Sequence, residues 1–267
     1  MEMEPLTAVF PHIASQMRCM LSNLYMAASA LAPAEAREWN AEVDQRAAML
    51  DQSFYQLLRL VNQLSAAAYL TNNDPLTLRN CDLSALVTEV CDAAASLAPL
   101  RGLTFTFTNR LDRHHVCAVA PDEMEQILYN LLSNAFKFTP AGGAVEVELS
   151  RKGEQILLSV ADTGCGIPAQ RMETLFDAYA HYDPTQPPPH GLGLGLALCR
   201  RFAQGQGGTL LARSREGVGS VFTLSLPDRT TENALQDFAV DYSGGFSHPL
   251  LGLADALPAK AFRIREQ

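Results

Sequence analysis

The chain has 267 residues, of which 48% are hydrophobic, so it is long and apolar enough to bury a substantial core, which excludes disorder of the whole chain. Acidic residues outnumber basic ones by 29 to 20, and this balance offers no basic surface for a phosphate backbone or an anionic membrane. The start, Met-Glu-Met-Glu-Pro, lacks a positive signal-peptide region, and no run of about 18 apolar residues occurs. We therefore expect a cytoplasmic protein with no nucleic-acid partner and no membrane insertion.

The six cysteines are scattered, without a CxxC pair or a cluster with histidine. This spacing argues against both a zinc site and a disulfide framework. We expect the cysteines to be reduced, buried, small apolar residues. They are Cys19, Cys81, Cys91, Cys117, Cys165 and Cys199.

The first third of the chain carries two stretches of apolar residues with alternating steps of four and three, which predict two long amphipathic helices. The first stretch is Ile13, Met17, Met20, Leu24, Ala27 and Leu31, and the second is Val43, Ala47, Leu50, Phe54, Leu57, Val61, Leu64 and Ala68. A break at Ala32-Pro33-Ala34 separates them, so the helices should fold back as an antiparallel hairpin. One hairpin leaves much of its apolar surface uncovered. We expect two copies to pair into a four-helix bundle; the alternative is a hairpin packed on its own downstream domain.

A turn cluster around Asn72, Asn73 and Pro75 marks a domain boundary, after which helices and strands alternate. Patterns predict helices at 82–97, 121–137 and 192–204, and strands at 103–107, 145–149, 156–161 and 219–226. Such an order is typical of an α/β sandwich with helices on one face of a mixed sheet. The fold class is therefore α+β, with a hairpin domain (1–72), a sandwich domain (73–228) and a tail (229–267). The tail is rich in apolar residues around Leu250, so we expect it to dock rather than remain free.

Three short segments of the second domain carry candidate chemistry. They are Asn130-Leu-Leu-Ser-Asn134-Ala-Phe-Lys137-Phe138-Thr139, Asp162-Thr-Gly164-Cys-Gly166-Ile-Pro168, and Gly191-Leu-Gly193-Leu-Gly195-Leu. Asn130 and Asn134 lie four residues apart on a helix, with Lys137 on the same face. This helix face can hold a metal ion and a polyphosphate. Each segment alone is equally compatible with ordinary surface amides or turns. Their joint order and spacing favour a nucleotide site.

In order and spacing the three segments resemble the nucleotide-binding boxes of the GHKL superfamily, which includes DNA gyrase, the heat-shock chaperone, histidine kinases and mismatch-repair ATPases. The sensor histidine kinases are the most similar branch, because Phe176, Gly207-Gly208 and the Gly217 to Phe222 segment match further family marks. The resemblance covers about residues 5–227. It implies a GHKL-type sandwich and a dimerisation bundle built from the hairpin.

The resemblance also implies roles for individual residues, with ATP and Mg²⁺ as cofactors. Asp162 would accept the adenine amino group, which guanine lacks at that position. Asn134 would be the magnesium ligand, since an amide oxygen suits a hard cation. Asn130 would lie beside the phosphates, Lys137 would neutralise their charge, and Phe138 would lie beside the nucleotide. The glycines would admit the base or free backbone amides for phosphate: Gly164, Gly166, Gly191, Gly193 and Gly195.

The family's phosphoacceptor box is altered in this chain. Its alignment on Arg18 puts Ser15 at the acceptor histidine and Gln16 at the neighbouring acid, so both reactive groups are missing. His12 lies one turn earlier, beside Pro11 and Ile13, and has no acidic neighbour. The lid, residues 177–190, contains no lysine or arginine, and His181 stands where the family often has a phosphate-binding arginine.

These observations favour an ATP-binding, histidine kinase-like protein of two-component type that lacks histidine autokinase activity. It would act as a dimeric, nucleotide-dependent interaction module, with a response regulator or another signalling protein as partner. The alternative is an active kinase that phosphorylates His12, Ser15 or a partner protein. Serine-kinase and ATP-hydrolysing branches of the superfamily have a glutamate base where this chain has Asn130, which argues against both. A structural protein with relic boxes is disfavoured because three boxes remain.

Overall fold

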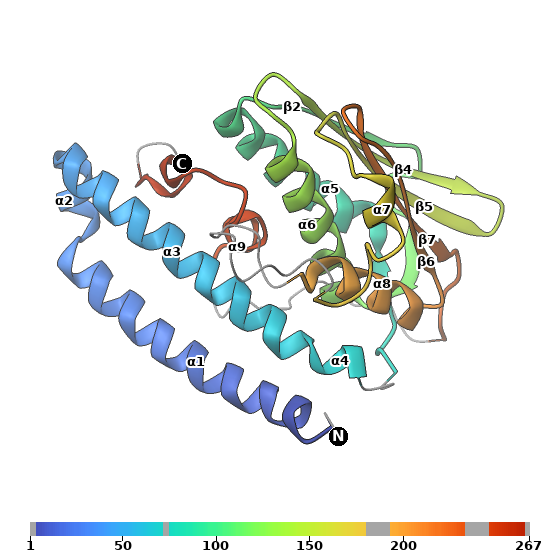
Figure 1. The fold of residues 1–267 in the computed structure, drawn as a ribbon, viewed down its shortest axis with the longest axis horizontal. Coiled ribbons are helices and arrows are strands. Elements are labelled where there is room, and N and C mark those ends of the chain that lie inside the picture. Colours follow the sequence, from blue (N-terminus) through green and yellow to red (C-terminus); the bar gives the residue numbers. More distant parts are fainter. Residues whose placement is uncertain (1–3, 72–74, 180–192, 233–245, 265–267) are drawn as a thin grey trace.

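The computed structural model describes residues 4–71, 75–179, 193–232 and 246–264, with side chains described from His12 onward. A helical arm lies beside a sandwich of helices and sheet, and the C-terminal helices lie between the two (Figure 1). The predicted α+β class is confirmed.

The arm consists of α1 (Glu4–Leu31), α2 (Ala34–Trp39), α3 (Ala41–Ala66) and α4 (Ala68–Thr71), with α1 packed antiparallel on α3 (Figure 1). The predicted break at Ala32-Pro33-Ala34 is followed first by the short helix α2, and the second long helix begins at Ala41. Asn40 has an extended backbone, and its Oδ1 accepts the amides of Glu42 at 3.0 Å and Val43 at 3.3 Å. This cap starts α3 and leaves α2 as a separate turn at the tip.

The two predicted apolar stretches differ in how far their residues are buried within the single chain. On α3, Ala47, Phe54 and Val61 are buried, whereas Leu50 and Leu57 are exposed. On α1 the predicted stretch is mainly exposed, and the helix instead packs inward through Ala14 and Leu21. The exposed members are Ile13, Met17, Met20, Leu24 and Leu31. Apolar side chains of both long arm helices are therefore uncovered in the single chain.

The sandwich contains a five-stranded sheet of order β2-β4-β5-β7-β6. Its strands are β2 (Thr104–Asn109), β4 (Ala144–Lys152), β5 (Gln155–Asp162), β6 (Thr209–Arg215) and β7 (Gly219–Pro227). Only the β2–β4 pair is parallel among these neighbours, so the sheet is mixed, as predicted. A separate two-stranded ladder joins β1 (Arg79–Asp82) to β3 (Val116–Val119).

Three helices cover one face of the sheet: α5 (Leu83–Leu97), α6 (Pro121–Phe138) and α8 (Gly195–Gly205) (Figure 1). The Asp82 side chain caps α5 by accepting the Ala85 amide at 3.0 Å. Two short elements, η1 (Ala98–Arg101) and α7 (Ala169–Met172), complete the sandwich. The segment Leu83–Arg101 is long and apolar enough to span a membrane by length and composition, but it packs on α6 and β2 as a core helix does.

All six cysteines are free thiols, and four of them are buried as expected. Cys19 and Cys165 are exposed, so the prediction of burial is wrong for these two. Cys19 lies on an outward-facing side of α1, and Cys165 lies in the loop after β5.

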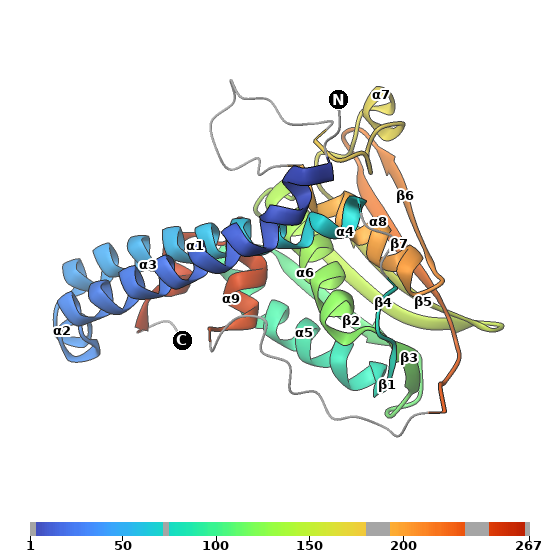
Figure 2. The ribbon, with the colours of Figure 1, turned by 90° about the horizontal axis from the view of Figure 1, so that it is seen from below.

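The C-terminal segment, residues 246–264, contains α9 (His248–Leu253) and η2 (Ala259–Phe262). It lies between α3 and α6, as both views show (Figures 1 and 2). Leu251, Leu253, Leu257 and Phe262 are each no more than 3% exposed. The segment thus joins the arm to the sandwich through an apolar seam of its own.

Candidate nucleotide site

Helix α6 presents the first predicted box along one side. Proline occupies its first turn, and Ile127, Leu128, Leu131 and Leu132 are fully buried, so this apolar stripe fixes the rotation of the helix. Asn130 is buried, Asn134 and Lys137 are half-buried, and Phe138 is half-exposed at the helix end. The Lys137 ammonium lies 5.3 Å from the centre of the Phe138 ring.

Asp162 is the last residue of β5, where the strand leaves the sheet beside β7. Its Oδ1 accepts the Gly164 amide at 2.8 Å, which fixes the orientation of the carboxylate. Burial raises the pKa of Asp162 above its ordinary value, while hydrogen bonds from the Gly164 and Ser220 amides oppose that rise. The group is thus a half-buried acceptor held by backbone donors.

The loop after Asp162 touches the end of α6. The Cys165 amide donates to the Phe138 carbonyl at 3.2 Å, and a Cβ at Gly164 would lie 2.6 Å from that oxygen. Gly166 has φ +66°, and a side chain there would overlap the Arg215 carbonyl. Glycine is therefore required at both positions, and the contact brings the first two boxes together.

The third box is described only in part. Gly193 has φ +69°, and Gly195 begins α8, where a Cβ would lie 3.6 Å from Asn130 Oδ1. The N-terminus of α8 therefore lies against the Asn130 face of α6. Gly191 and His181, which sequence reasoning also placed in this region, lie outside the described residues.

Two residues at this site were missed by the sequence analysis. Arg59 of α3 donates through Nη2 to Asn130 Oδ1 at 3.0 Å, and its Nε lies 3.1 Å from Asp255 Oδ2. Burial lowers the pKa of Lys137, the Asp255 charge raises it, and the Arg59 charge lowers it, so Lys137 is close to this ion pair. The sequence signals that could have revealed them are the charged residue Arg59 within the apolar stretch of α3 and the charged residue Asp255 within the apolar tail.

Ser15 and Gln16, the two positions of the altered acceptor box, are exposed on α1. Gln16 Nε2 lies 3.3 Å from His12 Nε2. A cavity of about 210 Å³ between the arm and α6 is lined by Arg18, Arg59 and Asn130, but not by Ser15. Of the predicted site residues that the structure describes, Asn130 alone lines it.

The residues present fit an adenine nucleotide with a hard cation. Asp162 offers an oriented carboxylate, the loop glycines leave the backbone accessible, and Lys137 offers positive charge. Among the described residues no group of three or more His, Cys, Asp or Glu could hold a metal ion. A magnesium ion here would take the Asn134 amide oxygen as its protein ligand and would neutralise phosphate charge.

Comparisons with known proteins identify the family of the sandwich domain. Residues 119–230 match the family described as histidine kinase-, DNA gyrase B- and HSP90-like ATPase. The chain is 34% identical over 180 residues to the circadian input-output histidine kinase CikA of Synechococcus elongatus, covering 65% of this chain and 24% of the relative. It is 30% identical over 220 residues to the alginate biosynthesis sensor protein KinB of Pseudomonas aeruginosa, covering 79% of this chain and 35% of the relative.

A solved structure, full-length ShkA in complex with AMPPNP, has 26% identity and a TM-score of 0.64, covering 83% of this chain and 46% of that one. The matched domain is of the ATP-binding histidine-kinase type used in two-component signalling. The chain is a sensor histidine kinase-like protein of the GHKL superfamily. The matched regions cover only 24% and 35% of the lengths of these two curated relatives.

Proposed function

We propose that the chain binds ATP and Mg²⁺ and works as a dimeric, nucleotide-dependent interaction module without histidine autokinase activity. One observation carries the binding part: the loop that orients Asp162 is bonded to the end of the helix that bears Asn134 and Lys137. The proposed adenine acceptor and the proposed phosphate-binding face are therefore joined by a direct backbone contact. The AMPPNP complex of the similar ShkA structure supports the same ligand class.

In this site Asp162 would accept the adenine amino group, and Asn134 would hold the magnesium ion between the protein and the phosphates. Lys137 would neutralise phosphate charge, and Phe138 would flank the nucleotide. The metal would supply charge neutralisation and orientation of the phosphate oxygens. Guanine would be rejected because it offers an oxygen to the Asp162 carboxylate.

The absence of autokinase activity rests on the acceptor position. Ser15 has no carboxylate beside it, because the next residue is Gln16, and the His12 Nε2 lies 3.3 Å from the Gln16 Nε2. His12 itself is exposed one turn earlier and does not line the cavity beside Asn130. Loss of a general base alone lowers a rate by about 100- to 10,000-fold.

The dimer is proposed from the uncovered apolar side chains of the arm. Met20 and Leu24 of α1 are 63% and 66% exposed, and Leu50 and Leu57 of α3 are 51% and 46% exposed. These residues belong to the two heptad stretches, so a second copy could cover them by forming a four-helix bundle. A response regulator that engages such a bundle is the proposed partner, and a cytoplasmic location is part of the same proposal.

Incubation with radiolabelled ATP and magnesium tests the catalytic part. We expect no label on histidine for the unmodified chain; acid-labile label would reveal phosphohistidine, and acid-stable label would favour Ser15 or another hydroxyl. Robust acid-labile label that disappears in His12→Ala would support the alternative of an active kinase with a relocated acceptor.

A variant with a restored acceptor box separates the effect of the missing acceptor residues from the effect of the lid that lacks lysine and arginine. The double change Ser15→His with Gln16→Glu restores nucleophile and base but leaves the lid unchanged. We expect it to remain a poor autokinase, because the lid sequence 177–190 still lacks a lysine or arginine for phosphate charge. Efficient autophosphorylation of this variant would show that the lid composition is not limiting.

A further inference from the structure

The C-terminal segment contacts the phosphate face of the proposed nucleotide site. Asp255, which follows α9, has its Oδ2 3.1 Å from Arg59 Nε, and the same guanidinium donates to Asn130 Oδ1 at 3.0 Å. The Asp255 charge also acts on Lys137. A carboxylate therefore lies against a cation that is itself bonded to the Asn130 amide, on the helix that the nucleotide phosphates would use.

This placement is not that of a surface ion pair. The Arg59 and Asp255 side chains are 10% and 29% exposed. The cation bonded to Asn130 is Arg59 of α3, and Arg18 of α1 lines the same cavity, while the lid sequence offers no cation. Arg59 is thus a buried cation between the arm and the sandwich, and the chain pairs it with its own carboxylate.

The segment is held along its whole length. Gln56 Nε2 donates to the Ala254 carbonyl at 3.3 Å, and Gln52 Nε2 donates to the Leu257 carbonyl at 2.8 Å. At the start, His248 Nδ1 lies 3.0 Å from Glu125 Oε1 of α6. These bonds fix the position of Asp255 between α3 and α6.

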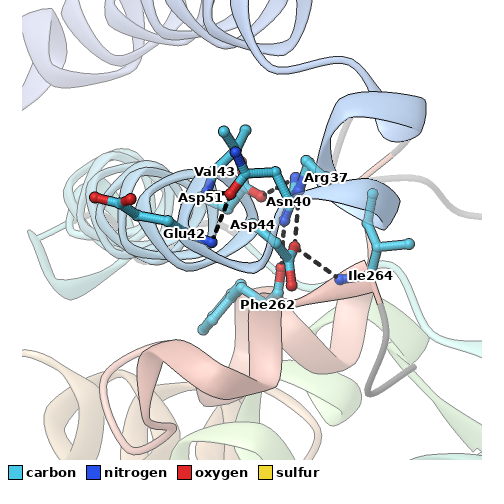
Figure 3. Close-up of polar contacts among 8 residues, drawn as sticks. All are labelled: Arg37, Asn40, Glu42, Val43, Asp44, Asp51, Phe262 and Ile264. Atoms are coloured by element: carbon cyan, nitrogen blue, oxygen red, sulfur yellow. Dashed lines mark hydrogen bonds and ion pairs between the residues drawn. The ribbon is translucent and has the colours of Figure 1, made fainter.

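The far end of the segment is fastened to a buried arginine (Figure 3). Arg37 of α2 reaches Asp44 at 3.1 Å and Asp51 at 2.7 Å, and it donates through Nη2 to the Phe262 carbonyl at 2.8 Å. The Ile264 amide donates to Asp44 Oδ1 at 3.4 Å. The tip of the arm therefore anchors the tail through backbone atoms.

We propose that Asp255 occupies, within the same chain, the anion site that a terminal nucleotide phosphate would take, so that residues 246–264 form a plug that competes with MgATP. The proposal rests on the proposed nucleotide binding. Phosphate would displace the carboxylate from Arg59, and release of the plug would loosen the arm from α6. Nucleotide binding would thereby be coupled to the arm that a partner protein contacts.

Two substitutions remove the plug in different ways. Asp255→Asn keeps the shape and removes the charge. Gly252→Val undocks α9 sterically, because a Cβ at Gly252 would overlap the ring of Tyr129, and neither residue belongs to the proposed nucleotide site. Lys260→Ala, on the exposed side of η2, is the matched control.

Calorimetric affinities for ATP, ADP and adenosine, measured on the full chain, test the competition. If the docked plug is populated at about 90%, its removal should tighten ATP binding on the order of tenfold, and Lys260→Ala should change nothing. Adenosine should show no gain in Asp255→Asn, because it has no phosphate to compete for the anion site. In the unmodified chain, MgATP should speed hydrogen exchange at residues 250–257.

The outcomes separate the two proposals. If all variants bind ATP with the affinity of the unmodified chain, the plug is wrong and the nucleotide site stands. Weaker ATP binding in Asp255→Asn would likewise overturn the plug and make Asp255 part of the site. If no variant binds any nucleotide, the proposed function itself fails. Should Gly252→Val not fold, Asp255→Asn and the exchange measurement still decide.

Discussion

Replacing Asp162 by asparagine should weaken ATP binding strongly and leave the fold intact. Asp162 Oδ1 is already engaged by the Gly164 amide at 2.8 Å, and an asparagine oxygen can accept the same bond. The other carboxylate oxygen would become an amide group, which donates where adenine also donates. A hydrogen bond to a charged group contributes about 1.5 to 3 kcal/mol, so we expect a loss of about 10- to 150-fold in ATP affinity.

The same substitution should not lower the free energy of unfolding at neutral pH. Burial raises the pKa of Asp162, so the folded state disfavours the ionised form. A raised carboxyl pKa contributes stability that is complete below the unfolded pKa and is lost as pH rises through the folded pKa. At neutral pH the uncharged asparagine therefore removes the unfavourable burial of an ionised carboxylate. The free energy of unfolding of the variant should be equal to that of the unmodified chain or slightly higher.

Binding has the opposite pH dependence, because adenine recognition needs the ionised carboxylate. Adenosine affinity in the unmodified chain should fall as pH drops through the Asp162 pKa, beginning above the range of an ordinary aspartate. Asp162→Asn should lack this dependence. Calorimetry with ATP, GTP and adenosine, with exposed Asp112→Asn as control, measures these effects; unchanged ATP affinity in Asp162→Asn would refute the assignment.

The remaining predictions concern the arm. Leu57→Glu with Leu64→Glu should yield monomers or insoluble protein by light scattering, because charge in a helical seam is costly, whereas exposed Gln45→Glu should not; a monomeric unmodified chain would contradict the proposed dimer. Arg37→Ala should lower the free energy of unfolding by about 3 to 5 kcal/mol in denaturant titrations, because it strands the buried Asp44 and Asp51 carboxylates. A loss below about 1 kcal/mol would mean that water replaces the guanidinium.

The parts of the fold that follow local rules could be predicted from the sequence. Helix α6 has proline in its first turn and a strong apolar stripe, and α5 has Asp82 as its cap. The β4–β5 hairpin follows from alternating residues on either side of Gly153, which has φ +61°. Each of these signals lies within a few residues of the element that it specifies.

Other elements depend on partners that are distant in the sequence. Strand β1, Arg-Asn-Cys-Asp, is short and polar, and its burial comes from pairing with β3, so it has no clear local signal. Strand β6 was also missed, because Leu210 alone among its residues is buried. The start of α3 could have been predicted, since Asn40 precedes Glu42 in a capping arrangement.

The candidate site divides in the same way. The sequence boxes could be predicted because the residues that bring them together belong to the boxes themselves. Glycine is required at 164 and 166 because the backbone of Phe138 and of Arg215 approaches these two positions. The Arg59, Asn130 and Asp255 cluster joins three segments that sequence spacing does not relate. Such a cluster becomes visible only when the arm, α6 and the tail are placed together.

Calorimetric titration of the unmodified chain and of Gly252→Val with ATP, ADP and GTP, with and without magnesium, is the most direct test of nucleotide binding. We predict magnesium-dependent binding of ATP in preference to GTP, tighter in Gly252→Val than in the unmodified chain. Absence of heat with every nucleotide in both proteins, or equal affinity for ATP and GTP, would contradict the assignment of Asp162 and α6 as an adenine nucleotide site.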